Sequence, residues 1–191
     1  MRRKYDELWK GLMEEVFEDF LHFVFPRADE LFDLQRGFDF IDKELIEKNP
    51  EPGEGSNTRF VDKLVKVFLK DGNEHCFLVH VEIQGQRDKL FAERMFRYYY
   101  RIFDWHRRPV TAVAIFTGQD GKTMPDRYHH EFMGTELRYK YNSLYVTEHT
   151  DEEVSHGSNF FSLAFLAAKK ALLKGRCSKG RYRNLSCWRS S

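Results

Sequence analysis

Two apolar, β-branched runs joined by three turn-forming residues are the feature that most constrains this fold. The runs are "RFVDKLVKVFLK" at 59–70 and "EHCFLVHVEIQ" at 74–84, and "DGN" lies between them. Short runs of this kind, separated by such residues, are typical of a β-hairpin. We therefore predict two antiparallel strands joined by a tight turn.

The register of this hairpin depends on the length of its loop. A two-residue loop would place Lys70 opposite Asn73, and a three-residue loop would place it opposite Glu74. Asn73 tolerates the left-handed conformation that a three-residue loop requires. The longer loop also sorts the side chains by polarity, whereas a slip of one residue would mix the two faces. It gives an almost wholly apolar face, made of Val61, Val65, Val67, Leu69, Phe77, Val79, Val81 and Ile83.

The favoured register places Asp62 directly opposite Glu82, on the other face of the hairpin. Their Cβ atoms would be roughly 4.5–5.5 Å apart, and two carboxylates at that distance repel one another. A Mg²⁺ ion held between them would remove the conflict, because it takes oxygen ligands from one or two carboxylates. The pair could instead be solvated at a sheet edge, or neutralised by Lys66 or an arginine. The residues alone leave both interpretations open.

Other polar side chains are expected near this pair. Gln84 is two residues beyond Glu82 and therefore on the same face. Residues 88–105 have helical periodicity, and Arg94, Arg97 and Arg101 fall on one flank of that helix. A helix between the strand ending at 84 and a buried strand at 110–118 predicts a right-handed crossover and parallel strands. The arginines could then grip a phosphodiester, or simply pair with Glu93 and Asp104 on a solvated face.

The remaining elements follow from periodicity and from helix- and strand-breaking residues. We predict an amphipathic helix over 5–25 that ends before Pro26, and a final amphipathic helix over 160–173. Residues 49–57 should form a loop, and residues 36–47 could be a short strand or a helix. The alternation of residues 137–146 predicts one further strand.

Composition bounds the class of protein. The chain has 191 residues, 41% of them hydrophobic and 18 of them Phe, which predicts one globular domain with a substantial core. Its net charge of +1 excludes a global positive field, so nucleic-acid binding would need a local patch. Cys76, Cys177 and Cys187 lack ligand-like spacing and are expected to be reduced thiols. With no apolar signal segment or membrane span, we expect a cytoplasmic protein that does not bind membranes.

The predicted order of elements resembles the PD-(D/E)XK nuclease superfamily, and more narrowly its Rpn family of recombination-promoting nucleases, or putative transposases. The resemblance rests on "RFVDKLVKVF", "FLVHVEIQGQRD", "FAERMFRYYYRIFD", "PVTAVAIFTG" and "YNSLYV". It implies an α/β fold with a restriction-endonuclease-like core, a central mixed sheet (αβββαβ) flanked by helices. That domain would span 1–173. Residues 174–191 would form a basic tail, either a solvated end or an arm that contacts nucleic acid.

The resemblance also implies a function, a Mg²⁺-dependent DNA endonuclease linked to recombination or mobile elements, in which Mn²⁺ can replace Mg²⁺. Asp62 and Glu82 match the metal-binding carboxylates, and Gln84 stands where the superfamily most often has lysine. Gln84 could orient an attacking water, but its neutral amide cannot offset developing negative charge. Arg94, Arg97 and Arg101 would contact the nucleic acid. The first helix often adds a carboxylate, and Asp19 or Glu15 could supply it here.

Alternative functions follow from the departures from the family pattern. Gln84 and a C-terminus shorter than usual for the family also fit a decayed site in a nucleic-acid-binding or protein-interaction domain of the same fold. A homodimer is compatible with either. His75, His80, His129 and His130 lack the spaced partners of a structural zinc site, so we expect none.

Overall fold

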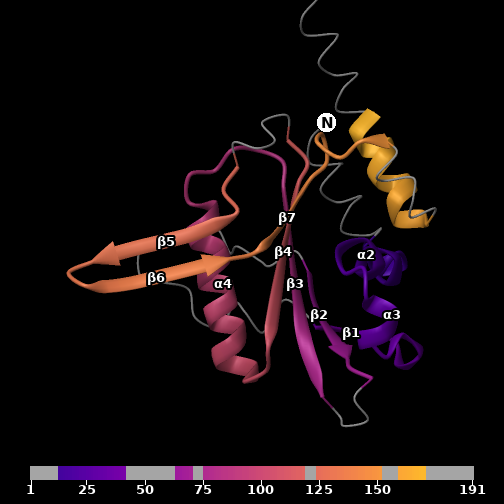
Figure 1. The fold of residues 1–191 in the computed structure, drawn as a ribbon, viewed down its shortest axis with the longest axis horizontal. Coiled ribbons are helices and arrows are strands. Elements are labelled where there is room, and N and C mark those ends of the chain that lie inside the picture. Colours follow the sequence, from indigo (N-terminus) through magenta and orange to yellow (C-terminus); the bar gives the residue numbers. More distant parts are fainter. Residues whose placement is uncertain (1–12, 42–62, 71–74, 119–123, 152–158, 171–191) are drawn as a thin grey trace, which may run out of the picture.

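A five-stranded mixed sheet forms the centre of the computed structural model, which describes residues 13–41, 63–70, 75–118, 124–151 and 159–170 (Figure 1). Its strand order is β1-β2-β3-β4-β7. The first three strands pair antiparallel, and β3, β4 and β7 pair parallel. The predicted mixed α/β class is therefore confirmed. The strands are β1 (Asp39–Ile41), β2 (Lys63–Phe68), β3 (Cys76–Gln84), β4 (Val110–Phe116) and β7 (Asn142–Tyr145).

The hairpin of β2 and β3 has the predicted register. Lys63 pairs with Val81, and Phe68 pairs with Cys76. Just beyond the last pair, the Leu69 amide donates to the His75 carbonyl over 3.0 Å. The loop at 71–74 and the predicted metal ligand Asp62 both lie outside the described residues. The register on which the proposed Asp62–Glu82 pairing depends is nevertheless the one observed.

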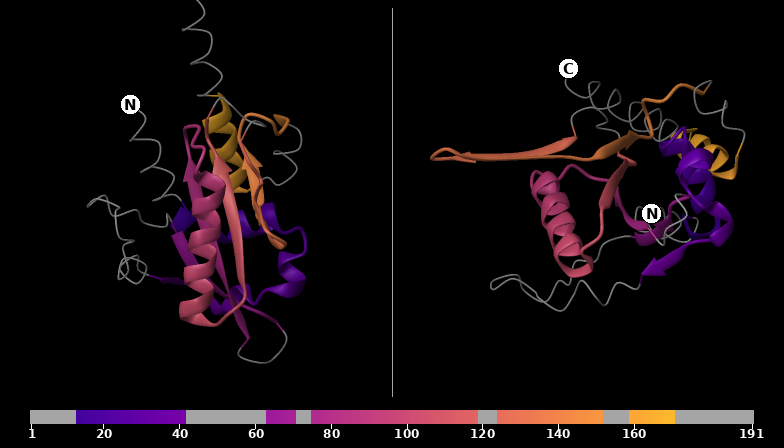
Figure 2. Two further views of the ribbon diagram at one scale, coloured as in Figure 1. Left: turned by 90° about the vertical axis from the view of Figure 1, so that its left-hand side faces the viewer. Right: turned by 60° about the horizontal axis from the view of Figure 1, so that its bottom comes forward.

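Helix α4 (Phe91–His106) makes the crossover between β3 and β4, and the two strands are parallel as predicted. Arg107, in the left-handed conformation at φ 50°, ends the helix. Tyr98 and Ile102 of α4 pack on Leu64 and Leu78 of the sheet. Figure 2 shows α4 on one face of the sheet, and this is the face to which Glu82 belongs by alternation along β3.

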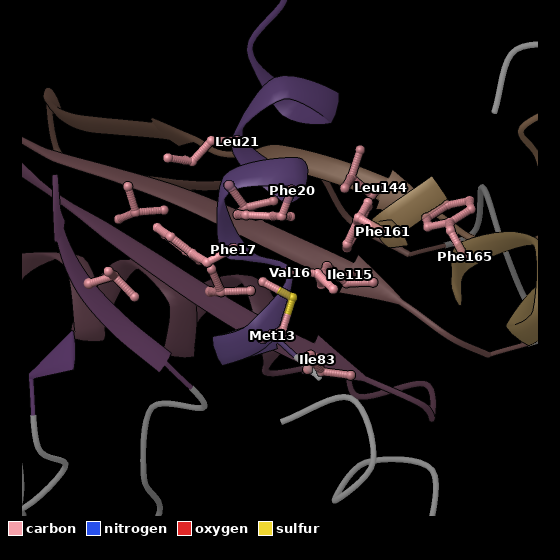
Figure 3. Packing of buried hydrophobic residues seen from close by; sticks show 14 of the residues in the cluster. Met13, Val16, Phe17, Phe20, Leu21, Ile83, Ile115, Leu144, Phe161 and Phe165 are labelled. Atoms are coloured by element: carbon pink, nitrogen blue, oxygen red, sulfur yellow. The ribbon is translucent and has the colours of Figure 1, made fainter. Parts of the chain in front are cut away.

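The opposite face is covered by α2 (Phe17–Val24) and by the helical residues 160–170 (Figure 3). Phenylalanines join the two helices: the Phe20 and Phe161 ring centroids are 5.3 Å apart, and those of Phe23 and Phe165 are 5.2 Å apart. Phe25 ends α2 immediately before Pro26, as predicted. Short helical turns, α3 (Ala28–Leu31) and η1 (Leu34–Arg36), then lead into β1. The ambiguity over 36–47 is resolved as strand at β1, and 42–47 lie outside the described residues.

The prediction of one strand over 137–146 is wrong. Residues 135–140 form β6 (Thr135–Lys140), which pairs with β5 (Arg127–Phe132) in a separate two-stranded sheet, and β7 begins at Asn142. Tyr141 lies between them and is buried, and its hydroxyl donates to the Pro125 carbonyl over 2.6 Å. This anchored tyrosine marks where the chain leaves the projecting hairpin and enters the central sheet (Figure 1).

Several expectations fall wholly or partly outside the described residues, among them the loop at 49–57 and the basic tail at 174–191. Of the three cysteines, Cys76 is described, and it is a buried free thiol. Among the described residues, no helix combines the length and the apolar character that a membrane span requires.

Candidate active site

Glu82 lies near the end of β3 and is buried, with 5% of its surface exposed. Among the described residues it is the only acidic side chain in the buried class. Its burial follows from the position of β3 in the sheet, between β2 and β4, where Glu82 pairs with Ala114 of β4. The sequence therefore places a carboxylate in the interior, an arrangement that requires polar or charged partners.

His80 is one such partner. It lies two residues before Glu82 on the same strand face, and its Nε2 is 3.2 Å from Glu82 Oε1. The His80 ring is fully buried and meets the ring of Tyr98 edge-on, with centroids 5.6 Å apart. Its Nδ1 has no hydrogen-bond partner among the described residues. A buried imidazole held in this way fixes the orientation of the Glu82 carboxylate.

Lys66 is engaged elsewhere. Its Nζ is 3.3 Å from Asp39 Oδ2 on β1, and it also lies over the Phe68 ring. Lys63, at the start of β2, pairs with Glu14 of the N-terminal segment. The alternative in which Lys66 neutralises an acidic pair therefore loses support, because this lysine already has a carboxylate partner.

Gln84 and Arg94 are in direct contact. An Arg94 guanidinium nitrogen donates to Gln84 Oε1 over 2.9 Å, and Gln84 Nε2 donates to the Gln86 carbonyl over 2.6 Å. Arg94 also pairs with Asp88, whose carboxylate accepts from the Leu90 amide at the start of α4. The predicted approach of the arginine flank to Gln84 is thus observed for Arg94. Both polar ends of Gln84 are occupied, so orienting a water would require one of these hydrogen bonds to exchange.

The other two arginines lie further along α4. Arg97 donates to Glu93 over 2.6 Å, which is the partner expected for a solvated flank. Arg101 is half-buried, and Asp104 pairs with Arg107. Seven residues of helix separate Arg94 from Arg101, a rise of about 10 Å. Arg94 alone of the three contacts Gln84 among the described residues.

In the described part of the N-terminal helix, residues 13–24, the predicted carboxylates Asp19 and Glu15 are not directed to Glu82. Its apolar side packs on Val79, Val81 and Ile83, which point to the face opposite Glu82. Asp19 instead accepts from the Phe160 amide over 2.9 Å, and Glu15 is exposed. The expectation that Asp19 or Glu15 joins the site is therefore not supported by this packing.

Glu82 is the one predicted metal ligand that the structure describes. Glu82 offers carboxylate oxygen, the ligand type that Mg²⁺ prefers, and Asp62, the second predicted ligand, lies outside the described residues. Sequence reasoning missed two polar contributors, His80 and Asp88. His80 could have been found, because two-residue periodicity puts it on the Glu82 face. Asp88 could not, because its role depends on the turn into α4.

An open groove of about 660 Å³ lies between α4 and the β6–β7 segment. Aromatic rings form its walls, and the Tyr99 and Tyr139 centroids are 4.9 Å apart. Arg138 and Lys140 line the same groove and are exposed. Aromatic and basic side chains in one groove are the elements with which proteins stack bases and contact phosphates.

Comparisons of this chain with known protein families, with curated proteins and with solved structures find no match.

Proposed function

We propose that this protein is a Mg²⁺-dependent endonuclease that hydrolyses DNA phosphodiester bonds, with Asp62 and Glu82 holding the metal. The observation that carries the proposal is the buried Glu82 carboxylate in the β2–β3 register that pairs Lys63 with Val81. Continued by one residue, that register would set Asp62 opposite Glu82. The element order helix, three strands, helix, strand also supports the restriction-endonuclease-like core that the sequence resemblance implies.

The protein's own residues would prepare the site in three ways. His80 would hold the Glu82 carboxylate in one orientation. Gln84, on exchanging a hydrogen bond, would orient the attacking water. Arg94 would contact a phosphate oxygen while keeping Asp88 as its partner, since a guanidinium has several donors. When bound, Mg²⁺ would supply Lewis-acid stabilisation of the charge that develops on the phosphate.

His80 would be a positioning residue, because it acts through Glu82. Loss of a side chain that orients a metal ligand typically reduces metal affinity or activity by about 10- to 100-fold. A His80→Gln variant keeps a donor and should lose less activity than His80→Leu. Equal activity in the two variants and the wild type would show that His80 does not position Glu82.

The decisive experiment is nicking of supercoiled plasmid in Mg²⁺ or Mn²⁺ by the full chain. The variants are Asp62→Asn and Glu82→Gln, which preserve the shape of each side chain. In Glu82→Gln, the amide oxygen at position 82 can still accept a hydrogen bond from His80. Glu30→Gln is the matched control, because Glu30 is an exposed carboxylate on α3 whose partner is Arg27 and not a residue of the site. Circular dichroism and a thermal melt establish that each variant is folded.

The proposal predicts that the wild type and Glu30→Gln cut, and that neither Asp62→Asn nor Glu82→Gln does. Cutting that survives both site substitutions would refute the site. If the wild type does not cut, the enzymatic proposal fails, and DNA binding at increasing salt separates the alternatives. Binding that weakens with salt indicates phosphate contacts by a decayed domain, whereas no binding favours a protein-interaction domain.

A further inference from the structure

The β5–β6 hairpin brings together side chains that are separated in the sequence. His129 pairs with Arg138, and Glu131 pairs with Glu136, across the two antiparallel strands. Because side chains alternate along a strand, these four residues share one face of the hairpin. His130 belongs to the other face, opposite Leu137.

This face has the composition and spacing of a metal site. The ligand atoms of His129, Glu131 and Glu136 all lie within 4.8 Å of one another, and all three residues are exposed. Among the described residues this is the one such group of three. Glu131 and Glu136 are like charges directly opposite one another, a repulsion that Arg138 and His129, the partners of Glu136, offset in part.

We propose that His129, Glu131 and Glu136 bind a divalent transition-metal ion of the Zn²⁺ class on this hairpin. His129 Nε2 and Glu136 Oε1 are 3.0 Å apart. Two tetrahedral ligands, each about 2.1 Å from one Zn²⁺, are separated by about 3.4 Å. A small separation of the two side chains would therefore let an ion replace the present hydrogen bond, and rotation of Glu131, whose ligand atom lies within 4.8 Å of both, would complete a three-ligand set.

The donor types select the ion. One imidazole and two carboxylates suit Zn²⁺ or Co²⁺, whereas Mg²⁺ favours oxygen ligands and water. The site is therefore chemically distinct from the one proposed at Glu82, and it does not rest on nuclease activity. Bound metal would link β5 to β6 and would leave positions for water or for an outside ligand.

Arg138 sets the affinity of the site. Its Nε donates to Glu136 Oε1, the same oxygen that faces His129. It can remain as an outer partner of a ligating carboxylate, but its charge opposes a nearby cation. Replacing Arg138 with a neutral residue of similar length should therefore tighten metal binding.

The test is a titration of the full chain with Co²⁺, followed by visible absorption, and with Zn²⁺, followed by calorimetry. We expect one site that is weakened at least about 10-fold in His129→Gln and in Glu131→Gln, and tightened in Arg138→Gln. The matched control His130→Gln, on the opposite face, should bind as the wild type does. Glu82→Gln should also bind normally, which separates this site from the proposed active site.

Two results would overturn the proposal. One is wild-type binding no tighter than that of His129→Gln and Glu131→Gln. The other is equal weakening by His130→Gln, which would indicate general histidine binding. Because the three ligands are exposed, these substitutions are not expected to unfold the hairpin.

Discussion

Replacing Phe161 with alanine should strongly destabilise the protein, whereas the same change at its neighbour Phe160 should not. Phe161 is fully buried near Phe20 (Figure 3). Its ring centroid lies 5.3 Å from that of Phe20 and 5.2 Å from that of Phe23. Phe160 is 74% exposed. Comparing Phe161→Ala with Phe160→Ala therefore tests whether residues 160–170 pack against α2, because the two positions are adjacent in one helix turn.

The magnitude follows from burial. Truncating a buried Phe to Ala typically costs about 3–5 kcal/mol in the free energy of unfolding, because the transfer free energy is lost and a cavity remains. For a chain of this size each 1 kcal/mol lowers the melting temperature by about 2–4 °C, so a decrease of about 6–20 °C is expected for Phe161→Ala. An exposed substitution such as Phe160→Ala should stay within about 0.5 kcal/mol.

Urea unfolding followed by circular dichroism measures both values, and Phe161→Leu provides a milder variant if Phe161→Ala does not fold. A cost below about 1 kcal/mol at Phe161, or equal costs at the two positions, would refute the docking of this helix on α2.

Further predictions concern local interactions. The hydrogen bond from His22 to Asp29, 2.9 Å long, raises the pKa of His22, so its stabilising contribution is present below about pH 6.5 and is lost as the pH rises through the raised value. Asp29→Asn should lower the pKa seen in an NMR titration of the His22 ring, and an unchanged pKa would contradict the pairing. Met133 has φ 47° in the turn before Gly134, a left-handed conformation that Asn tolerates better than Met does. Met133→Asn should therefore stabilise the hairpin by about 1 kcal/mol and slow its amide hydrogen exchange. Faster exchange would contradict this. Asn159 Oδ1 accepts from an amide three residues on, over 2.9 Å, so Asn159→Ala should cost about 1 kcal/mol in urea unfolding, and no loss would rule out this cap.

The central hairpin could be predicted from the sequence because two independent constraints agreed. The turn residues after Lys70 favoured a three-residue loop, and the apolar pattern around Val79 and Val81 rejected the other register. The parallel pairing of β3 and β4 followed from the handedness of a strand–helix–strand unit, with α4 between them. The handedness rule applies regardless of which tertiary contacts the side chains make, so it can be used from the sequence alone.

The β5–β6 hairpin could not be predicted in the same way. Its strand "RYHHEF" has no apolar alternation, because most of the ribbon projects from the body and has no core face to bury (Figure 2). The aromatic contacts at its base, where Tyr128 stacks on Phe96 at 5.5 Å, join residues far apart in the sequence. The break between β6 and β7 at Tyr141 depends on tertiary contacts of that residue, which the local sequence pattern does not reveal.

The positions of Glu82, Gln84 and Arg94 could be predicted from the sequence, but their interaction partners could be predicted only in part. Periodicity alone put Gln84 on the Glu82 face and Arg94 on the flank of α4. It could not decide that Arg94 would divide its donors between Gln84 and Asp88, because that choice depends on the turn between β3 and α4.

The most direct test of the proposed metal site is a crystal of the protein soaked in Mn²⁺, examined by anomalous scattering. We expect one manganese peak about 2.0–2.2 Å from an oxygen of Asp62 and from an oxygen of Glu82, on the α4 side of the sheet. A structure with the two carboxylates on opposite faces of the sheet, or with no manganese between them, would contradict it.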